Sequence, residues 1–229
     1  MQILIDIGAV MVGYILGSIP FGLLIIKIKT GKDIRTVESG RTGGTNAVRA
    51  AGFWAGLLTA ILDILKGAVA VWIAQALSPS NELVHVLAPV GAILGHNHSI
   101  FLMERDENGK LRLRGGAGGA TAVGGAIGLW QPMFPIVFIA GALLWFSLGI
   151  ASVATMAVGV IVIIVFAIRA SLGQQPAMDI WYGVLAEILL IWALRPNIKK
   201  LLAGNERVIK YSLNGWLRAR KESKAETNK

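Results

Sequence analysis

The stretch IASVATMAVGVIVIIVFAI (150–168) runs without a charged residue and is long enough for a helix to cross the hydrocarbon core of a bilayer. In hydrocarbon only helices and closed barrels satisfy every backbone hydrogen-bonding group, and barrel strands alternate apolar with polar residues. This stretch is continuously apolar and does not alternate. It therefore predicts a membrane-spanning helix.

The rest of the chain repeats this pattern. Of its 229 residues, 55% are hydrophobic and 15% are charged, and the mean hydropathy is +0.64, which is too apolar for a soluble domain of this size. The predicted fold class is an all-α integral membrane protein with about seven transmembrane helices and cytoplasmic glycine-rich loops. The predicted spans are 3–26, 52–78, 84–103, 118–131, 133–149, 150–168 and 178–195. Few charges separate the fourth to the sixth, so an arrangement in which two of them merge stays open.

The basic residues predict the orientation of the chain. Three segments, 27–49, 104–116 and the tail from Arg195, hold 20 of the 22 lysines and arginines. With seven spans these segments lie on one side, which the positive-inside rule identifies as cytoplasmic, so the N-terminus is expected outside and the C-terminus inside. The net charge of +9 then reflects topology and attraction to anionic membrane lipids, and nucleic-acid binding is disfavoured.

Composition also sets the domain organisation. We expect a polytopic membrane domain at 1–205 and a basic cytoplasmic tail at 206–229, in which Trp216 and Leu217 stand among basic residues, as in segments that lie on headgroups. Asp6 and the lack of a basic leader identify the first apolar stretch as a retained span. The absence of cysteine excludes disulfides, thiolate metal sites and cysteine nucleophiles. No internal repeat supports an inverted-repeat transporter.

Some polar residues stand where the surroundings are apolar. Asp63 and Lys66, in ILDILKGAVA (61–70), are three residues apart and share a helical face, which favours a local ion pair that orients the helix. His96, in LGHNHSIF (94–101), lies at the cytoplasmic end of the third span. A hydrogen-bonding or structural role is favoured there, because no acidic cluster with metal-ligand spacing accompanies it. No metal site is predicted.

The first loop, within TGKDIRTVESGRTGGTNAVRAAGFW (30–54), is rich in glycine and in hydrogen-bond donors and runs into the second span. Backbone amides freed by glycines, together with an arginine fork, suit a cluster of anionic oxygens. The donors that surround its glycines are Ser39, Thr42, Thr45, Asn46 and Arg49.

A second glycine-rich stretch, RGGAGGATAVGG (114–125), permits close backbone approach before the fourth span. It fits neither the Walker pattern nor the GxGxxG fingerprint, so no nucleotide is predicted. Two interpretations stay open: a phosphate loop, or small-residue helix packing of the GxxxG kind through Gly115 and Gly119 or through Gly124 and Gly128.

Together these segments resemble the acyl-phosphate-dependent glycerol-3-phosphate acyltransferases of bacterial phospholipid synthesis. The first motif of that family reads approximately SGNxGATNxxR and stands here as SGRTGGTNAVR (39–49). The second, GGKGVAT, stands as GGAGGAT (115–121) and is preceded by the dipeptide Gly95-His96. The third places a histidine three residues before Asn-Ile and ends in a glutamate, here LRPNIKKLLAGNE (194–206), and a D-x-x-K-G element is matched by Asp63, Lys66 and Gly67. The resemblance extends from GSIPFG (17–22) to Glu206.

The resemblance implies transfer of an acyl group from acyl phosphate to the 1-hydroxyl of glycerol 3-phosphate in the bacterial cell membrane, giving lysophosphatidic acid and phosphate without a cofactor. It makes 1–205 an acyltransferase-like domain. Catalytic roles fall to Ser39, Arg49 and Asn197. Substrate or phosphate binding falls to Thr45, Asn46, His96, Gly115, Gly116 and Gly118, and structural roles fall to Asp63, Lys66 and Glu206.

Three positions depart from the motifs: Ala117 replaces the lysine, Leu194 the histidine and Arg41 an asparagine. An extra segment, LMERDENGKLRLR (102–114), contains Asn108-Gly109, which predicts a hairpin with a two-residue loop. We expect Arg41 or Arg114 to supply the missing phosphate contact, and the alternative is a surface hairpin with solvated charges. Two functions stay open, an active acyltransferase and a non-catalytic membrane paralogue that binds a phospholipid or anionic headgroup.

Overall fold

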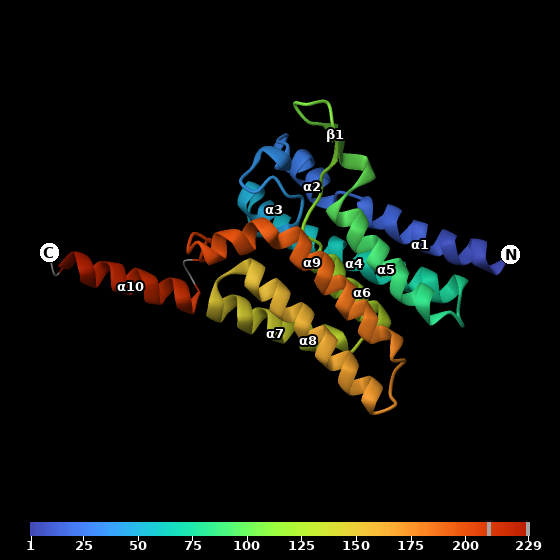
Figure 1. Cartoon of the computed structure of the whole chain (residues 1–229). Coiled ribbons are helices and arrows are strands. Elements are labelled where there is room, and N and C mark those ends of the chain that lie inside the picture. The colour runs from blue at the N-terminus through green and yellow to red at the C-terminus, as the bar shows by residue number, and fades with distance from the viewer. Residues whose placement is uncertain (210–211, 228–229) are drawn as a thin grey trace.

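A computed structural model of the chain describes residues 1–209 and 212–227 and is a bundle of long helices (Figure 1). The predicted helical membrane fold is confirmed. The α-helices are α1 (Gln2–Ser18), α2 (Phe21–Thr30), α3 (Gly44–Ala51), α4 (Phe53–Leu77), α5 (Glu82–Asn97), α6 (Gly119–Leu129), α7 (Met133–Leu148), α8 (Ala151–Ser171), α9 (Met178–Leu202) and α10 (Leu213–Thr227). Short 3-10 turns cover Ile34–Thr36 and Ile100–Leu102, and a two-stranded antiparallel sheet pairs β1 (Met103–Arg105) with β2 (Leu111–Leu113).

The surface of the bundle is that of a membrane protein. Three helical stretches are long and apolar enough to cross a bilayer, namely Gln2–Thr30, Phe53–Leu77 and Ala151–Ser171. α6 and α7 are shorter apolar helices and remain separate, so the predicted fourth to sixth spans do not merge. Large apolar side chains are exposed on the outside, among them Phe138 at 65% and Leu143 at 66%. Lipid is the solvent that such a surface requires. The count of seven spans stays a prediction.

The first predicted span, 3–26, is divided into two helices. α1 ends at Ser18 because Pro20 forces the preceding Ile19 into an extended conformation, with φ −60° and ψ 117°. α2 begins directly after Pro20. The break exposes the backbone oxygen of Ile19, and the Lys66 Nζ donates to it at 3.2 Å. The chain turns at this point without leaving a buried carbonyl unpaired.

Glycines let the helices approach one another closely. A Cβ at Gly13 of α1 would lie 2.2 Å from the backbone oxygen of Ala88 in α5. A Cβ at Gly124 of α6 would lie 1.8 Å from the backbone oxygen of Ile64 in α4. The small-residue packing that the sequence left open therefore holds for the interior of α6. At Gly115 and Gly116, which precede this helix, an added Cβ would also clash, in this case with the end of α5.

Two helices end at residues other than the ends of the predicted spans. α5 ends at Asn97, short of the predicted 103, because the Ser99 side chain accepts from the backbone of Phe101 and starts a 3-10 turn. α9 continues to Leu202, past the predicted end at 195. Pro196 removes one helical donor, and the Arg195 Nε donates to the freed oxygen of Trp192 at 2.8 Å, which lets the helix continue.

The extra segment forms the predicted hairpin, but its loop is longer than predicted. Asp106 N donates to Lys110 O at 3.0 Å and Gly109 N donates to Asp106 O at 2.8 Å. Gly109 has φ +74°, so it follows a tight turn as the left-handed residue of a three-residue loop. Figure 1 shows the hairpin together with α2 and α3 at one end of the bundle, opposite the start of α1. We call this the loop end.

Candidate active site

The conformation of the first loop (31–43) is fixed by the side chain of Asn46, which lies in α3 directly after the loop. The Asn46 Nδ2 donates to the backbone oxygens of Ile34 at 3.3 Å, Val37 at 3.0 Å and Arg41 at 2.9 Å. The side chain is buried. Its amide hydrogens are thus used by the loop, and only Oδ1 lacks a partner among the described residues.

Replacing Asn46 with alanine is expected to destabilise the protein by about 1–3 kcal/mol, because buried loop oxygens lose their donor. The measurement is thermal unfolding in detergent by intrinsic fluorescence. Thr45→Ala is the matched control, since Thr45 is the exposed neighbour in the same helix. Equal melting temperatures for the two variants would contradict this role.

The glycine loop (115–118) lies against the C-terminal end of α5. Gly116 N donates to the backbone oxygen of His96 at 2.8 Å. A Cβ at Gly115 would stand 2.2 Å from that oxygen, and a Cβ at Gly116 would stand 2.0 Å from His96 Nε2. The loop requires glycine at both positions because its backbone touches α5.

The first loop and the glycine loop meet beside His96. Thr42 N donates to Gly115 O at 3.4 Å. The His96 Nε2 lies against Gly116 and 4.0 Å from where a Cβ at Gly43 would stand. We call the place where Gly43, Gly116 and His96 come together the interloop gap. The amides of Thr42 and Gly116 donate to backbone oxygens there, and His96 Nε2 is the side-chain group that faces it.

Beneath the interloop gap lies a buried charged cluster. Lys66 Nζ is 2.9 Å from Asp63 Oδ1 and 2.8 Å from His96 Nδ1, and His96 Nδ1 is 3.5 Å from Asp63 Oδ1. All three side chains are buried. The pairing of Asp63 and Lys66 anticipated from their spacing is present, and the histidine joins it from α5.

Arg41 reaches across from the first loop to α9. Its Nη1 donates to Asn197 Oδ1 at 2.8 Å and its Nη2 donates to Ala193 O at 2.7 Å. Burial lowers the pKa of Arg41 and the charge of Glu206 opposes that effect. The guanidinium stays charged in either case. Its two partners lie on either side of Leu194 in the sequence of α9.

The contact of Arg41 continues into a longer network. Asn197 Nδ2 donates to Glu206 Oε1 at 2.8 Å, and Ser152 Oγ donates to the same oxygen at 3.1 Å. Arg207 adds an ion pair to Glu38 at 3.3 Å. The first loop, the start of α8 and the segment after α9 are therefore joined by charged and amide groups.

Arg114 lies on the other side of the first loop. Its Nη1 pairs with Glu104 of the hairpin at 3.0 Å, and its Nη2 is 2.8 Å from where a Cβ at Gly40 would stand. Glu104 also faces Arg35 at 3.7 Å. Both candidate phosphate contacts, Arg41 and Arg114, thus already have protein partners, and both lie next to the first loop.

The remaining motif side chains are on the surface. Ser39, Thr45 and Arg49 are exposed, and Ser39 Oγ accepts from Arg41 N at 3.4 Å. Within the described part of the chain, no hydrogen bond or ion pair joins Thr45 or Arg49 to the glycine loop. These three side chains are close in sequence to Gly43, which borders the interloop gap. Because they are exposed, a ligand can reach them.

Two buried polar side chains beside the glycine loop were missed by reasoning from sequence. Asn97 Oδ1 and Thr121 Oγ1 have no hydrogen-bond partner among the described residues. Asn97 Oδ1 is 2.7 Å from where a Cβ at Gly118 would stand, and Gly118 has φ +85°. The available signals were the position of Asn97 after His96 and that of Thr121 at the end of GGAGGAT.

Within residues 1–209 and 212–227, no group of three or more His, Asp or Glu side chains is arranged to hold a metal ion. The site is built from backbone amides, amide side chains and cations. Such groups are hydrogen-bond donors and positive charges, which suit an anionic ligand.

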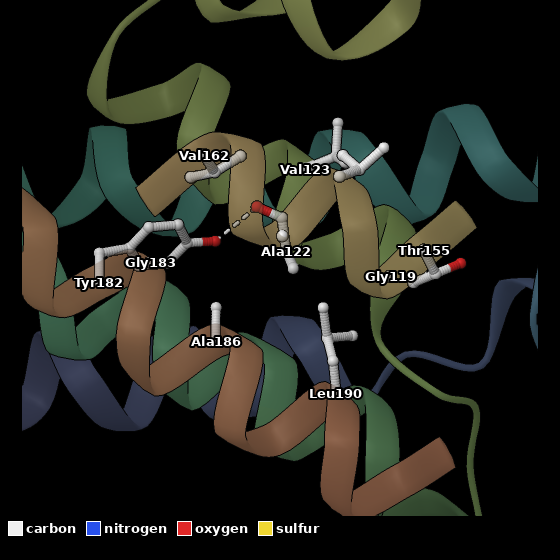
Figure 2. A pocket seen from close by; sticks show the side chains of 11 residues that line it. Gly119, Ala122, Val123, Thr155, Val162, Tyr182, Gly183, Ala186 and Leu190 are labelled. Carbon is white, nitrogen blue, oxygen red and sulfur yellow. Dashed lines mark hydrogen bonds between the residues drawn. The ribbon is translucent and has the colours of Figure 1, made fainter. Parts of the chain in front are cut away.

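A small apolar cavity of about 20 Å³ begins one residue after the glycine loop. It lies between α6, α8 and α9, and Figure 2 shows Gly119 and Thr155 at one end and Tyr182 at the other. Tyr182 donates from its hydroxyl to Ala122 O at 2.6 Å, so this polar end is closed. The wall is made of small and aliphatic side chains, including Ala186 and Leu190.

The fold and the site define a multi-pass membrane protein in which two glycine-rich loops meet at one end, beside a small apolar cavity. Residues 7–204 match the family described as glycerol-3-phosphate acyltransferase. The chain belongs to this family.

Individual relatives are similar in sequence to this chain over most of their length. A glycerol-3-phosphate acyltransferase of Rubrobacter xylanophilus is 34% identical over 89% of this chain and 95% of its own. That of Rhodopseudomonas palustris is 35% identical over 91% of this chain and 98% of its own, and glycerol-3-phosphate acyltransferase 3 of Dehalococcoides mccartyi is 37% identical over 86% and 93%.

Solved structures share the fold. The chain is similar to PlsY (YgiH), an integral membrane glycerol 3-phosphate acyltransferase, in its glycerol 3-phosphate form, with a TM-score of 0.75, 29% identity and coverage of 91% of this chain and 95% of that chain. The lysophosphatidic acid form also gives a TM-score of 0.75, at 27% identity, covering 90% of this chain and 96% of that one.

Proposed function

We propose that this chain transfers an acyl group from acyl phosphate to glycerol 3-phosphate, forming lysophosphatidic acid and inorganic phosphate at the cytoplasmic face of a bacterial membrane. The observation that carries the proposal is the meeting of the first loop and the glycine loop at His96, together with the small apolar cavity that begins at Gly119. A substrate with a phosphate head and an acyl tail would place its head at these loops and its tail among the apolar helices. In this orientation the loop end and the C-terminus are cytoplasmic and the N-terminus is outside.

The phosphate of the donor would lie in the interloop gap, held by the amides of the glycine loop and by His96. Ser39, Thr45 and Arg49 are exposed and would bind the phosphate of the acceptor. Asn197, held by Arg41 and Glu206, would face the reacting groups from α9. Orientation and charge stabilisation of this kind supply large rate factors without a covalent enzyme intermediate.

The reaction balances without a cofactor. The 1-hydroxyl oxygen of glycerol 3-phosphate forms a bond to the acyl carbon, and the bond from that carbon to the phosphate oxygen breaks. The hydroxyl proton passes to the departing phosphate, which is itself a base. This proton transfer explains why the site needs no Ser-His-Asp arrangement.

The test is a donor comparison with purified protein in nanodiscs. Acyl phosphate, acyl thioester and free fatty acid are each incubated with glycerol 3-phosphate, and lysophosphatidic acid and released phosphate are quantified. We expect product from acyl phosphate only, with one phosphate per ester formed. Binding of glycerol 3-phosphate without turnover of any donor would instead support the non-catalytic membrane paralogue.

The apolar cavity is expected to set the preferred acyl-chain length. Replacing Ala186 with phenylalanine puts a ring into the cavity, so the ratio of turnover with long donors to turnover with short donors should fall by about 10-fold, as for other apolar pockets that are shortened. Ile188→Phe is the matched control, because Ile188 is on the same helix and 56% exposed toward lipid.

The long-to-short ratio is measured within each variant, so partial loss of folded protein does not change it. An unchanged ratio in Ala186→Phe would mean that the chain is bound elsewhere.

A further inference from the structure

A buried cation approaches the interloop gap from beneath it. No lysine or arginine occurs between Arg114 and Arg169, so α6 and the glycine loop carry no positive charge, and position 117 holds an alanine. Arg114 is paired with Glu104. Lys66, in contrast, is one imidazole ring away from the gap, because its Nζ is 2.8 Å from His96 Nδ1 while Nε2 of the same ring lies against Gly116.

The position of Lys66 determines which ring nitrogen of His96 carries the proton. An ammonium has only donors, so the Nδ1 atom 2.8 Å away must accept a hydrogen bond. The other neighbour of Nδ1, Asp63 Oδ1, is farther at 3.5 Å and is itself paired with Lys66 at 2.9 Å. A neutral ring that accepts at Nδ1 has its hydrogen on Nε2.

We propose that Asp63 and Lys66 are positioning residues that hold His96 as the Nε2–H tautomer, so that this N–H donates to a phosphate group bound in the interloop gap. The proposal rests on the proposed function for the identity of the phosphate, and it extends the local ion pair predicted from sequence to a role in ligand binding. Lys66 polarises the ring, and the donated hydrogen bond is strengthened by the charge behind it.

The cluster is anchored so that it cannot swing away from the gap. Lys66 Nζ also donates to the backbone oxygen of Ile19 at 3.2 Å, at the break between α1 and α2. The Phe21 ring is 5.8 Å from Nζ. His96 is 6% exposed, and the side-chain hydrogen bond that it makes within the described residues is at Nδ1. The Nε2 atom thus faces the gap from a rigid support.

Two measurements test the proposal without requiring turnover. The tautomer of His96 is read from ¹⁵N chemical shifts of histidine-labelled protein, assigned with His85→Gln and His98→Gln variants. We expect Nε2–H in the wild type. Binding of inorganic phosphate is measured by calorimetry, and we expect Lys66→Met and His96→Phe to weaken it by about 10- to 100-fold.

The conservative variant separates a ligand contact from a merely structural role. Glutamine at position 96 can present an N–H near the place of Nε2, so His96→Gln should retain most phosphate binding while His96→Phe loses it. The exposed His98→Phe, two residues along, is the matched control. Lys66→Met leaves Asp63 unpaired and for that reason can fail to fold. In that case the Asp63→Asn/Lys66→Met double variant, and the comparison of His96→Gln with His96→Phe, still test the proposal.

An Nδ1–H tautomer in the wild type, or phosphate binding that is equal in His96→Phe and His98→Phe, would overturn the proposal. Failure of the proposed function gives a different result. In that case the wild type binds phosphate through the Nε2–H of His96 and yet makes no ester from acyl phosphate.

Discussion

Arg41→Ala is expected to lower kcat/KM for acyl transfer on the order of 100-fold, the loss typical of a removed charge-stabilising donor. The guanidinium joins the first loop to α9 through Asn197 Oδ1 and Ala193 O. Its loss releases the loop and leaves Asn197 without a donor. Arg41→Lys should recover only part of the activity, because a single ammonium does not reproduce the two-pronged contact.

The control for this prediction is Arg112→Ala on the hairpin. Arg112 is exposed, so its loss changes the net charge equally without touching the site. Activity is measured in nanodiscs with acyl phosphate and glycerol 3-phosphate. Arg114→Ala is assayed beside it, and full activity in both Arg41→Ala and Arg114→Ala would exclude arginine as the replacement for the cation absent at position 117.

Gly116→Ala is expected to have an effect as large, at least about 100-fold on kcat/KM. The added Cβ would stand 2.0 Å from His96 Nε2 and 2.8 Å from its Cδ2, so either the ring or the glycine loop has to move. Either movement shifts the groups that border the interloop gap, and a shift of this kind lowers the rate of catalysis. The fold itself should survive, because the clash involves a single side chain.

The control for Gly116 is Gly8→Ala in α1, where an added Cβ meets no atom within 4 Å. Both variants are compared for melting temperature and for kcat/KM. Wild-type activity in Gly116→Ala would contradict the proposal that this loop binds the phosphate, because a clash between the added Cβ and His96 would then have no effect on catalysis.

The fold was largely predictable because hydrophobicity reports membrane helices directly. The stretch 150–168 predicts α8 almost to its ends, and α6 and α7 lie within one or two residues of their predicted spans. The failures have local causes. The break at Ile19 follows from Pro20, and the continuation of α9 past Pro196 depends on Arg195, whose side-chain donor the sequence does not locate.

The parts of the candidate site could be found from sequence, but their contacts could not. Glycine density predicted close backbone approach at 115–118, yet only the fold brings Gly116 against His96. The spacing of Asp63 and Lys66 predicted one ion pair, and the addition of a histidine from another helix required the packing of α4 on α5. Likewise, nothing in the local sequence relates Arg41 to Asn197 in α9.

The central claim is that phosphate is bound between the first loop and the glycine loop. It is tested most directly by a structure of the wild type with a non-hydrolysable acyl phosphonate and glycerol 3-phosphate. We expect the phosphonate phosphorus in the interloop gap, within hydrogen-bonding distance of His96 Nε2 and the amides of the glycine loop, and the chain in the cavity between α6, α8 and α9. A phosphonate bound elsewhere, with the gap between Gly43 and Gly116 empty, would contradict the account.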